Sequence, residues 1–348
     1  MSDIKQVQYR QLGSSGLRVS VPILGAMSFG STEWQSWVLD EDKSIEILKA
    51  AWDRGINTFD TANMYSNGES ERIIGKFIEK YNIPRNQLVI LTKCFFHVAP
   101  KPSEHTPLKM AELNQQRQYV NQGGLSRAAI FNQVEASLQR LNTTYIDLLQ
   151  IHRRDPETPA EETMKALHDL VQSGKVRYIG ASAMKAWQFA HMNEVAARNG
   201  WTKFVSMQDE YSLLYREEER EMHAYCRFHG IGIIPYGPLN GGHLARPLGT
   251  STVRDESAKG TPWAFNPTDA DRAILSRVEE LAQKHGVTMA KIALAWIDLK
   301  VSSPIVGTSS VKRIEDNIPD PNLKLSDEEV KYLEELYVPK AIRGLLSE

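Results

Sequence analysis

The chain has 348 residues, of which 41% are hydrophobic and 24% charged, and its formal net charge is −2. This near-neutral balance gives no reason to expect a nucleic acid or an anionic membrane as a partner. The apolar runs are far shorter than the roughly 20 residues that span a bilayer. Two cysteines, Cys94 and Cys226, and an N-terminus (residues 1–5) without an apolar signal segment are typical of a reduced compartment. We therefore expect a cytoplasmic protein.

Eight short apolar runs, most of them followed by a helical pattern, succeed one another along the chain. The runs that predict strands cover residues 23–26, 56–59, 88–92, 145–151, 176–181, 204–207, 231–234 and 305–306. Helical spacing predicts helices over residues 42–54, 70–80, 126–141, 160–172, 184–198, 216–229, 269–285, 288–299 and 311–317. Because no block of different composition interrupts the alternation, we predict an α/β fold. It is a (β/α)8 TIM barrel of about 22–320, in a single domain of residues 1–348.

Four segments add to this barrel. Turn residues at 13–16 separate two strand candidates and predict a β-hairpin over residues 7–21. A capping box, Ser326 with Glu329 three residues later, opens a tail helix predicted over residues 326–337. Two long polar stretches, 95–124 and 236–268, show no clear pattern, and loops of this length in a compact domain are usually functional. We expect both at the C-terminal face, where barrel enzymes hold their active sites.

Four polar residues lie at or after the ends of three consecutive strand candidates. They are Asp60, Tyr65, Lys93 and His152. Each alone has an ordinary interpretation, such as a turn former, a packed phenol or a solvated cation. A phenol is also a poor proton donor at neutral pH, because its reference pKa is roughly 10. A neighbouring lysine stabilises phenolate, so the grouping points to an acid at the barrel mouth.

These four residue types, in this order, resemble the catalytic tetrad of the aldo-keto reductases. The likeness extends through residues 55–71, 145–155, 174–182 and 304–310. Within the family the chain is similar to the fungal versiconal-type and aryl-alcohol reductases and their bacterial relatives, through residues 145–159 and 201–222. The resemblance implies that the hairpin plugs the N-terminal end of the barrel. It also implies NADPH-dependent reduction of an aldehyde or ketone to an alcohol.

The resemblance gives each tetrad residue a role. Tyr65 is the general acid, which gives its proton to the carbonyl oxygen as hydride arrives at carbon. Lys93 lowers the pKa of Tyr65, and Asp60 holds the ammonium in place. His152 donates a hydrogen bond to the carbonyl oxygen and orients it. Because no side chain supplies hydride, a cofactor must bring it.

No Gly-x-Gly-x-x-Gly fingerprint follows a strand, which argues against a Rossmann mode of cofactor binding. The residues that the resemblance assigns to NADPH are instead Ser182, Gln208, Tyr236, Gly237, Pro238, Leu239, Gly307, Ser309, Arg313 and Asn317. Ser182 and Gln208 meet the carboxamide, Tyr236 stacks on the nicotinamide, and residues 237–239 lie beneath the pyrophosphate. Gly307, Ser309, Arg313 and Asn317 meet the adenosine half of the cofactor. The N-terminus of the helix that follows the last strand could hold a phosphate.

Two positions depart from the family pattern. Ala183 stands where many members have an asparagine that contacts the carboxamide. Ser309 and Ser310 lie where related reductases often carry a basic residue for the 2′-phosphate, which leaves Arg313 as the main cation there and Lys312 as a weaker candidate. The preference for NADPH over NADH therefore depends mainly on Arg313.

Two other functions stay open for the same fold. One is a cofactor-binding regulatory protein like the potassium-channel β subunits, and the other is a barrel that acts on sugar phosphates. Four histidines lack metal-ligand spacing, so we expect no metal: His97, His105, His243 and His285. The expected partner is a small carbonyl compound, and the sequence does not fix the oligomeric state. Trp34 and Trp37 follow the first barrel strand. They either form a wall of the substrate pocket or pack a loop onto the rim of the barrel.

Overall fold

The computed structural model describes residues 7–261 and 264–344. Its centre is a parallel sheet of eight strands in the order β10-β3-β4-β5-β6-β7-β8-β9. The strands are β3 (Ile23–Gly25), β4 (Thr58–Asp60), β5 (Val89–Cys94), β6 (Ile146–Ile151), β7 (Val176–Ser182), β8 (Ser206–Gln208), β9 (Gly232–Ile233) and β10 (Ile305–Gly307). The backbone N–H groups of Ser302 and Ile305 donate to the carbonyls of Ile233 and Pro235, both at 2.9 Å. These bonds join the two ends of the sheet, so the predicted (β/α)8 barrel is confirmed.

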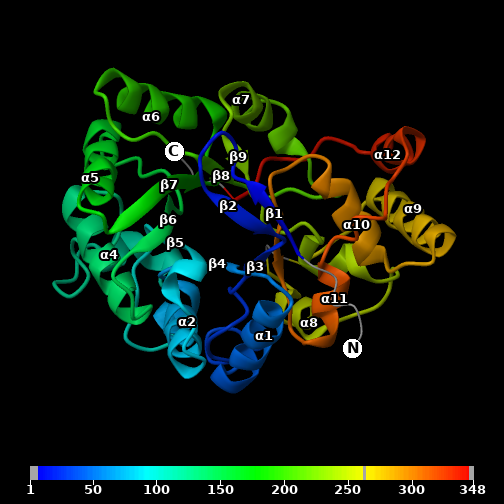
Figure 1. Cartoon of the computed structure of the whole chain (residues 1–348), viewed down its shortest axis with the longest axis horizontal. Coiled ribbons are helices and arrows are strands. Elements are labelled where there is room, and N and C mark those ends of the chain that lie inside the picture. Colours follow the sequence, from blue (N-terminus) through cyan, green and yellow to red (C-terminus); the bar gives the residue numbers. More distant parts are fainter. Residues whose placement is uncertain (1–6, 262–263, 345–348) are drawn as a thin grey trace.

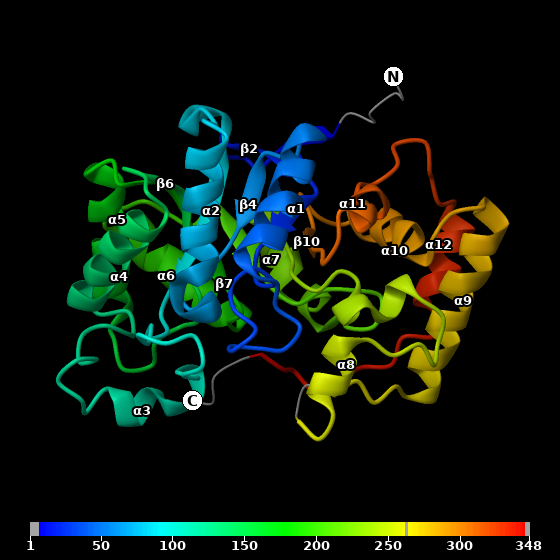
Figure 2. The ribbon, with the colours of Figure 1, turned by 90° about the horizontal axis from the view of Figure 1, so that it is seen from below.

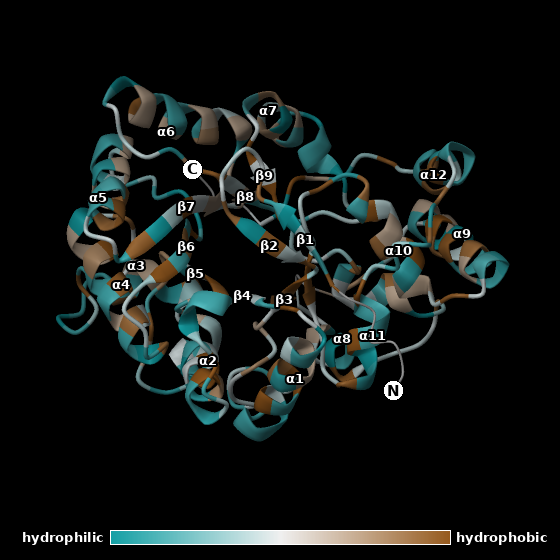
Figure 3. Ribbon diagram, in the orientation of Figure 1, coloured by the Kyte–Doolittle hydropathy of each residue, from teal (hydrophilic) through white to brown (hydrophobic). Residues whose placement is uncertain are grey.

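Helices surround this sheet (Figure 1). They are α1 (Glu41–Asp53), α2 (Glu69–Lys80), α3 (Met110–Leu113), α4 (Arg127–Arg140), α5 (Ala160–Gln172), α6 (Ala186–Arg198), α7 (Met222–His229), α8 (Val253–Ala258), α9 (Asp269–His285), α10 (Met289–Asp298), α11 (Lys312–Asn317) and α12 (Asp327–Glu334). Short 3-10 turns are η1 (Tyr65–Gly68), η2 (Arg85–Gln87), η3 (Pro107–Lys109), η4 (Glu217–Glu219) and η5 (Asn240–Ala245). Hydrophilic residues gather on the outer faces of the helices (Figure 3), as amphipathic spacing requires. No helix in the described ranges is long and apolar enough to cross a membrane.

The N-terminal hairpin covers one end of the barrel. It pairs β1 (Gln8–Gln11) with β2 (Arg18–Val21) in antiparallel register, as predicted. Its Leu12 and Val19 belong to a buried cluster with inward-facing strand residues: Ile23, Val89, Leu91, Leu148, Ile234 and Ile305. The backbone N–H of Ser20 also donates to Oγ1 of Thr58 at 2.9 Å. The hairpin therefore closes the N-terminal end with apolar side chains and hydrogen bonds.

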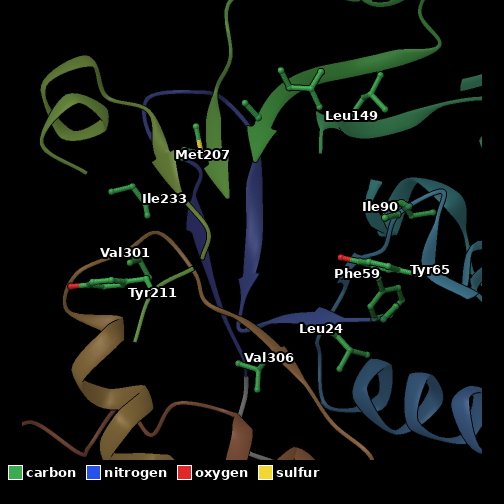
Figure 4. Close-up of a cluster of buried hydrophobic side chains, with 14 of the residues drawn as sticks. Leu24, Phe59, Tyr65, Ile90, Leu149, Met207, Tyr211, Ile233, Val301 and Val306 are labelled. Carbon is green, nitrogen blue, oxygen red and sulfur yellow. The ribbon is translucent and has the colours of Figure 1, made fainter. Parts of the chain in front are cut away.

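Strand alternation separates a helix-facing layer from an inner layer. One set of side chains packs under the helices (Figure 4): Leu24, Phe59, Ile90, Leu149, Met207, Ile233 and Val306. Neighbouring positions point inward, since successive side chains of a strand alternate between its faces. Lys93 lies two residues after inward-facing Leu91, and Gln150 lies two after Leu148. The same period therefore brings polar side chains to the inner face at the C-terminal end.

The long loops project from the end opposite the hairpin, where α3 and α8 lie in Figure 2. Segment 95–124, predicted without regular structure, contains η3 and the short helix α3. Asn67 ties this segment down. Its Nδ2 donates to the carbonyls of Lys101 (2.8 Å) and Glu104 (2.7 Å), and its Oδ1 accepts from the N–H of Ala99 (3.1 Å). The expected position at the C-terminal face is confirmed.

Two predicted helix ranges are wrong, and one segment predicted without regular structure contains a helix. The helix expected over 216–229 is broken into η4 and α7, and the tail helix expected over 326–337 ends at Glu334. The Tyr337 hydroxyl, just beyond α12, accepts from the Arg216 N–H at 2.8 Å and donates to Glu217 Oε1 at 2.6 Å, which joins these two segments. Segment 236–268 holds α8, which begins with a capping box of Thr252 and Asp255.

Candidate active site

Asp60, Lys93 and Tyr65 meet inside the barrel mouth. Lys93 is 1% exposed, and its Nζ lies 2.6 Å from Asp60 Oδ1, 2.9 Å from the Thr61 carbonyl and 3.4 Å from the Tyr65 hydroxyl. Strand alternation explains the geometry, because Asp60 ends β4 and Lys93 occupies an inward position of the adjacent β5. An ammonium this deeply buried requires a counter-charge, which Asp60 provides.

Tyr65 reaches this pair because the chain turns back after β4. It begins η1, and the next two residues, Ser66 and Asn67, have φ values of +49° and +51°. Asn tolerates this left-handed region better than most residues, and its side chain here also binds segment 95–124. The Tyr65 ring lies 6.3 Å from that of Trp34, centroid to centroid. The phenol is thus held between the strand ends and the loop that follows β3.

Burial and charge act in opposite directions on Tyr65 and Lys93. Burial raises the pKa of Tyr65, the Lys93 charge lowers it, and the net direction is upward. Burial lowers the pKa of Lys93, but the charge of Asp60, followed by that of Tyr65, gives a net increase. The predicted influence of Lys93 on Tyr65 therefore has the right sign, but the effect of burial on the phenol's pKa is larger. At neutral pH the site holds a protonated phenol beside an ammonium.

His152 lies just beyond β6 and faces Tyr65. Its backbone N–H donates to the Cys94 carbonyl at 2.9 Å, which extends the β5–β6 pairing. The imidazole stands edge-on to Tyr65 at 6.0 Å and to Phe96 at 5.1 Å, centroid to centroid. Burial, then the charges of Arg153 and Lys93, hold the pKa of His152 well below 6.5. The imidazole is therefore neutral at neutral pH, with one N–H to donate.

Gln150 is part of the site although sequence reasoning did not select it. It is fully buried, its Nε2 donates to Asp60 Oδ2 at 3.1 Å, and its Oε1 accepts from Gln208 Nε2 at 2.9 Å. The signal was present in the sequence as a glutamine at an inward position of β6, two residues after the apolar Leu148. Such a polar group needs partners when buried, and it finds them in the Asp60 network.

Ser182 and Gln208 lie side by side at the ends of β7 and β8, where they are register partners. Gln208 Nε2 donates a hydrogen bond to Asp60 Oδ2 at 2.8 Å. Ser182 Oγ is buried and has no hydrogen-bond partner among the described residues. An unpaired buried hydroxyl beside an amide oxygen suits the donors and acceptors of a carboxamide, so these residues fit a nicotinamide.

Tyr236 lies three residues beyond the end of β9 and is half-buried at the mouth. The C-terminal segment returns to it, because a Cβ added at Gly344 would lie 3.1 Å from the Tyr236 hydroxyl. Arg343 fixes this segment through an ion pair with Glu210, Nη2 to Oε1 at 2.5 Å. Gly237, with φ +69°, turns the chain into Pro238 and Leu239. Sequence reasoning did not find the Arg343–Glu210 contact, which joins residues far apart in the chain.

The residues assigned to the adenosine half lie after β10, away from the tetrad. Gly307 ends that strand and is exposed, and Asn317, at the end of α11, is buried. Arg313 and Ser309 are exposed, and Arg313 Nη1 donates to Ser309 Oγ at 3.0 Å. Side-chain hydrogen bonds thus join Asp60, Tyr65, Lys93 and Gln208 in one network. Within residues 7–261 and 264–344, the side chains of Arg313 and Ser309 bond to each other and do not belong to that network.

Comparison with known proteins gives one consistent result. The family model described as the aldo/keto reductase family matches residues 23–338. An aldo-keto reductase of Alternaria alternata is 53% identical, over 97% of this chain and 93% of its own. Versiconal hemiacetal acetate reductase of Aspergillus parasiticus is 50% identical, over 97% and 98% respectively. A putative aryl-alcohol dehydrogenase of Schizosaccharomyces pombe is 50% identical over 99% of both chains. The family match agrees with the barrel fold and with the geometry of Asp60, Lys93 and Tyr65. The chain therefore belongs to the aldo/keto reductase family.

Proposed function

We propose that this protein reduces an aldehyde or ketone to the corresponding alcohol with NADPH, and that Tyr65 donates the proton. The observation that carries the proposal is the buried contact between the Tyr65 hydroxyl and Lys93 Nζ, at 3.4 Å, with Asp60 on the far side of the ammonium at 2.6 Å. The bound nicotinamide supplies the hydride. The family match, which spans residues 23–338, supports one functional domain.

Tyr65 holds the proton that the reaction needs. Its raised pKa keeps the phenol protonated at neutral pH. As hydride reaches the carbonyl carbon, charge builds on the carbonyl oxygen, which becomes more basic than phenolate and takes the proton. The phenolate left behind lies beside the Lys93 ammonium, which stabilises it. Asp60 keeps that ammonium in place throughout.

His152 orients the carbonyl oxygen. Its imidazole is neutral, so it donates one N–H without competing as an acid. The ring is fixed by edge contacts with Tyr65 and Phe96, and a donor fixed in advance costs little reorganisation when charge develops. Tyr65 and His152 therefore converge on one oxygen from two sides.

The residues proposed to bind the cofactor lie at the same face of the barrel as the tetrad. Ser182 Oγ and Gln208 Oε1 would hold the carboxamide, and the half-buried Tyr236 ring would cover one face of the nicotinamide. Residues 237–239 would lie along the pyrophosphate. The remaining contacts, with the adenosine half, would come from Gly307, Ser309, Arg313 and Asn317.

A panel of aldehydes and ketones, assayed by the loss of NADPH absorbance and by chromatography of the alcohol product, tests this function. We expect turnover of some members by the wild type and none above background by Tyr65→Phe. A protein that binds NADPH but consumes none with any member, and oxidises none of the matching alcohols with NADP⁺, would refute the proposal.

A further inference from the structure

Arg153 is a half-buried cation at the barrel mouth. It directly follows His152 at the end of β6, and its Nη1 donates to the His152 carbonyl at 2.6 Å. That is its one hydrogen bond within residues 7–261 and 264–344, and no carboxylate in those ranges forms an ion pair with it. The other N–H groups of the guanidinium are thus uncommitted. A partly desolvated charge of this kind favours an anion beside it.

The charged neighbours of Arg153 are engaged elsewhere. Arg154 lies over the ring of Trp187, at 5.9 Å from its centroid. The nearest carboxylate in sequence, Asp155, accepts from the Leu125 N–H at 2.7 Å and from Thr158 Oγ1 at 2.8 Å. Its other oxygen accepts from the N–H of Glu157. Neither residue compensates the charge of Arg153.

The position of Arg153 relates this free charge to the reacting groups. Burial dominates the pKa values of Tyr65, His152 and Tyr236, and the positive charge of Arg153 lowers all three. These residues come from η1, from the end of β6 and from the end of β9, so they surround the mouth. The guanidinium also binds the carbonyl of His152, the residue whose imidazole the proposed mechanism places at the substrate carbonyl, so this free charge lies at the same strand end as the reacting groups.

We propose that Arg153 binds a carboxylate on the substrate, so that the preferred substrates are aldehydes or ketones that carry a carboxylate near the carbonyl group. The inference rests on the proposed function and specifies its substrate class. The planar fork of arginine matches the two oxygens of a carboxylate. One uncompensated positive charge also balances a singly charged carboxylate better than a doubly charged phosphate.

A matched pair of substrates tests the role of Arg153. para-Formylbenzoate and para-formylbenzamide have nearly the same shape and differ in charge. We expect a higher kcat/KM for the benzoate in the wild type, and a loss of that preference by roughly ten- to hundredfold in Arg153→Met, the range for a hydrogen bond to a charged group. Arg153→Lys keeps the charge without the fork and should retain part of the preference. Arg154→Met removes an equal charge from the neighbouring residue and should retain the whole preference for the benzoate.

Binding without turnover separates this proposal from the proposed reaction. Benzoate and benzamide are titrated by calorimetry into the protein saturated with NADP⁺. We expect tighter binding of benzoate by the wild type, lost in Arg153→Met and kept in Arg154→Met, even if neither aldehyde is reduced. No preference for the anion in the wild type would overturn the proposal. An equal loss for benzoate and benzamide, or an equal loss of NADPH affinity, would do the same, because the guanidinium would then serve the fold or the cofactor.

Discussion

Gln208 Nε2 donates to Asp60 Oδ2 at 2.8 Å, although the two residues lie on strands β8 and β4, which are separated by three others in the sheet. The other oxygen of Asp60 holds Lys93. One buried carboxylate therefore joins the residue proposed to meet the nicotinamide with the residue proposed to stabilise phenolate. Asp60 thus links the cofactor side of the site to the proton donor by hydrogen bonds.

Tyr65→Phe should reduce kcat by roughly 10²–10⁴-fold, the usual contribution of a general acid. NADPH affinity should stay nearly constant, because the hydroxyl contacts Lys93 and no residue assigned to the cofactor. Stopped-flow turnover and quenching of tryptophan fluorescence by NADPH measure the two quantities separately. A variant that keeps more than about a tenth of the wild-type kcat would rule out Tyr65 as the acid.

Lys93→Met should damage both rate and stability. The change leaves Asp60 as a buried carboxylate without its counter-charge, a situation that typically costs 3–5 kcal/mol, so ~3–5 kcal/mol of unfolding free energy should be lost. The double variant Asp60→Asn with Lys93→Met removes both charges and should recover most of this stability while kcat stays low. Urea denaturation and turnover assays on the three proteins check the prediction. Recovery of rate together with stability would make the ion pair purely structural.

Gln150→Leu should lower kcat about tenfold, because Asp60 loses a hydrogen bond that orients it and such bonds to charged groups are worth about 1.5–3 kcal/mol. The residue positions Asp60 and does not touch the reacting atoms, so the substrate KM should barely change. Gln150→Glu should be worse, since it places a second carboxylate beside Asp60 Oδ2, and its kcat should fall further as pH rises. If both variants behave alike at every pH, Gln150 acts by packing only.

The sequence predicted what depends on local pattern and strand period. The strand positions, the hairpin and the capping box at Ser326 are all found in the structure. Long-range contacts were not predictable in this way. Nothing near residue 216 signals that its backbone N–H binds the hydroxyl of Tyr337. The net rise in the pKa of Tyr65 also follows from burial, a property of the folded chain that no single segment displays.

The pH dependence should reflect the neutral state of His152. Because its pKa lies well below 6.5 in the folded chain, kcat should show no titration of this residue near pH 6.5. Below that pH the unfolded chain gains a proton at residue 152 that the folded chain lacks. The wild type should therefore lose stability relative to His152→Asn as pH falls below 6.5, by up to about 1.4 kcal/mol per pH unit. Urea denaturation of both proteins at several pH values measures the difference, and parallel curves would contradict the assignment.

The preference for NADPH should depend on Arg313. The cofactors differ by one 2′-phosphate, and an arginine fork suits its oxygens. Arg313 is exposed on α11, its guanidinium bonded to Ser309 Oγ at 3.0 Å and to no carboxylate in the described ranges, so it is available to a phosphate. Arg313→Ala should cost roughly 1.5–3 kcal/mol of NADPH affinity, the range for a hydrogen bond to a charged group, and should leave NADH affinity almost unchanged. Titration of both cofactors into the wild type and the variant measures the change.

Lys312→Ala is the matched control for Arg313→Ala. Lys312 is an exposed cation one position earlier on the same helix, and its loss changes the net charge equally. If Arg313 binds the 2′-phosphate directly, the Arg313 variant should narrow the ratio of NADPH to NADH affinity by about tenfold or more, while the Lys312 variant changes it little. Equal effects of the two substitutions would mean that Arg313 only attracts the anion through its charge. High salt would then weaken the effects of both substitutions on cofactor affinity. A wild type that binds NADH as tightly as NADPH would remove the proposed preference, since no 2′-phosphate contact would then contribute.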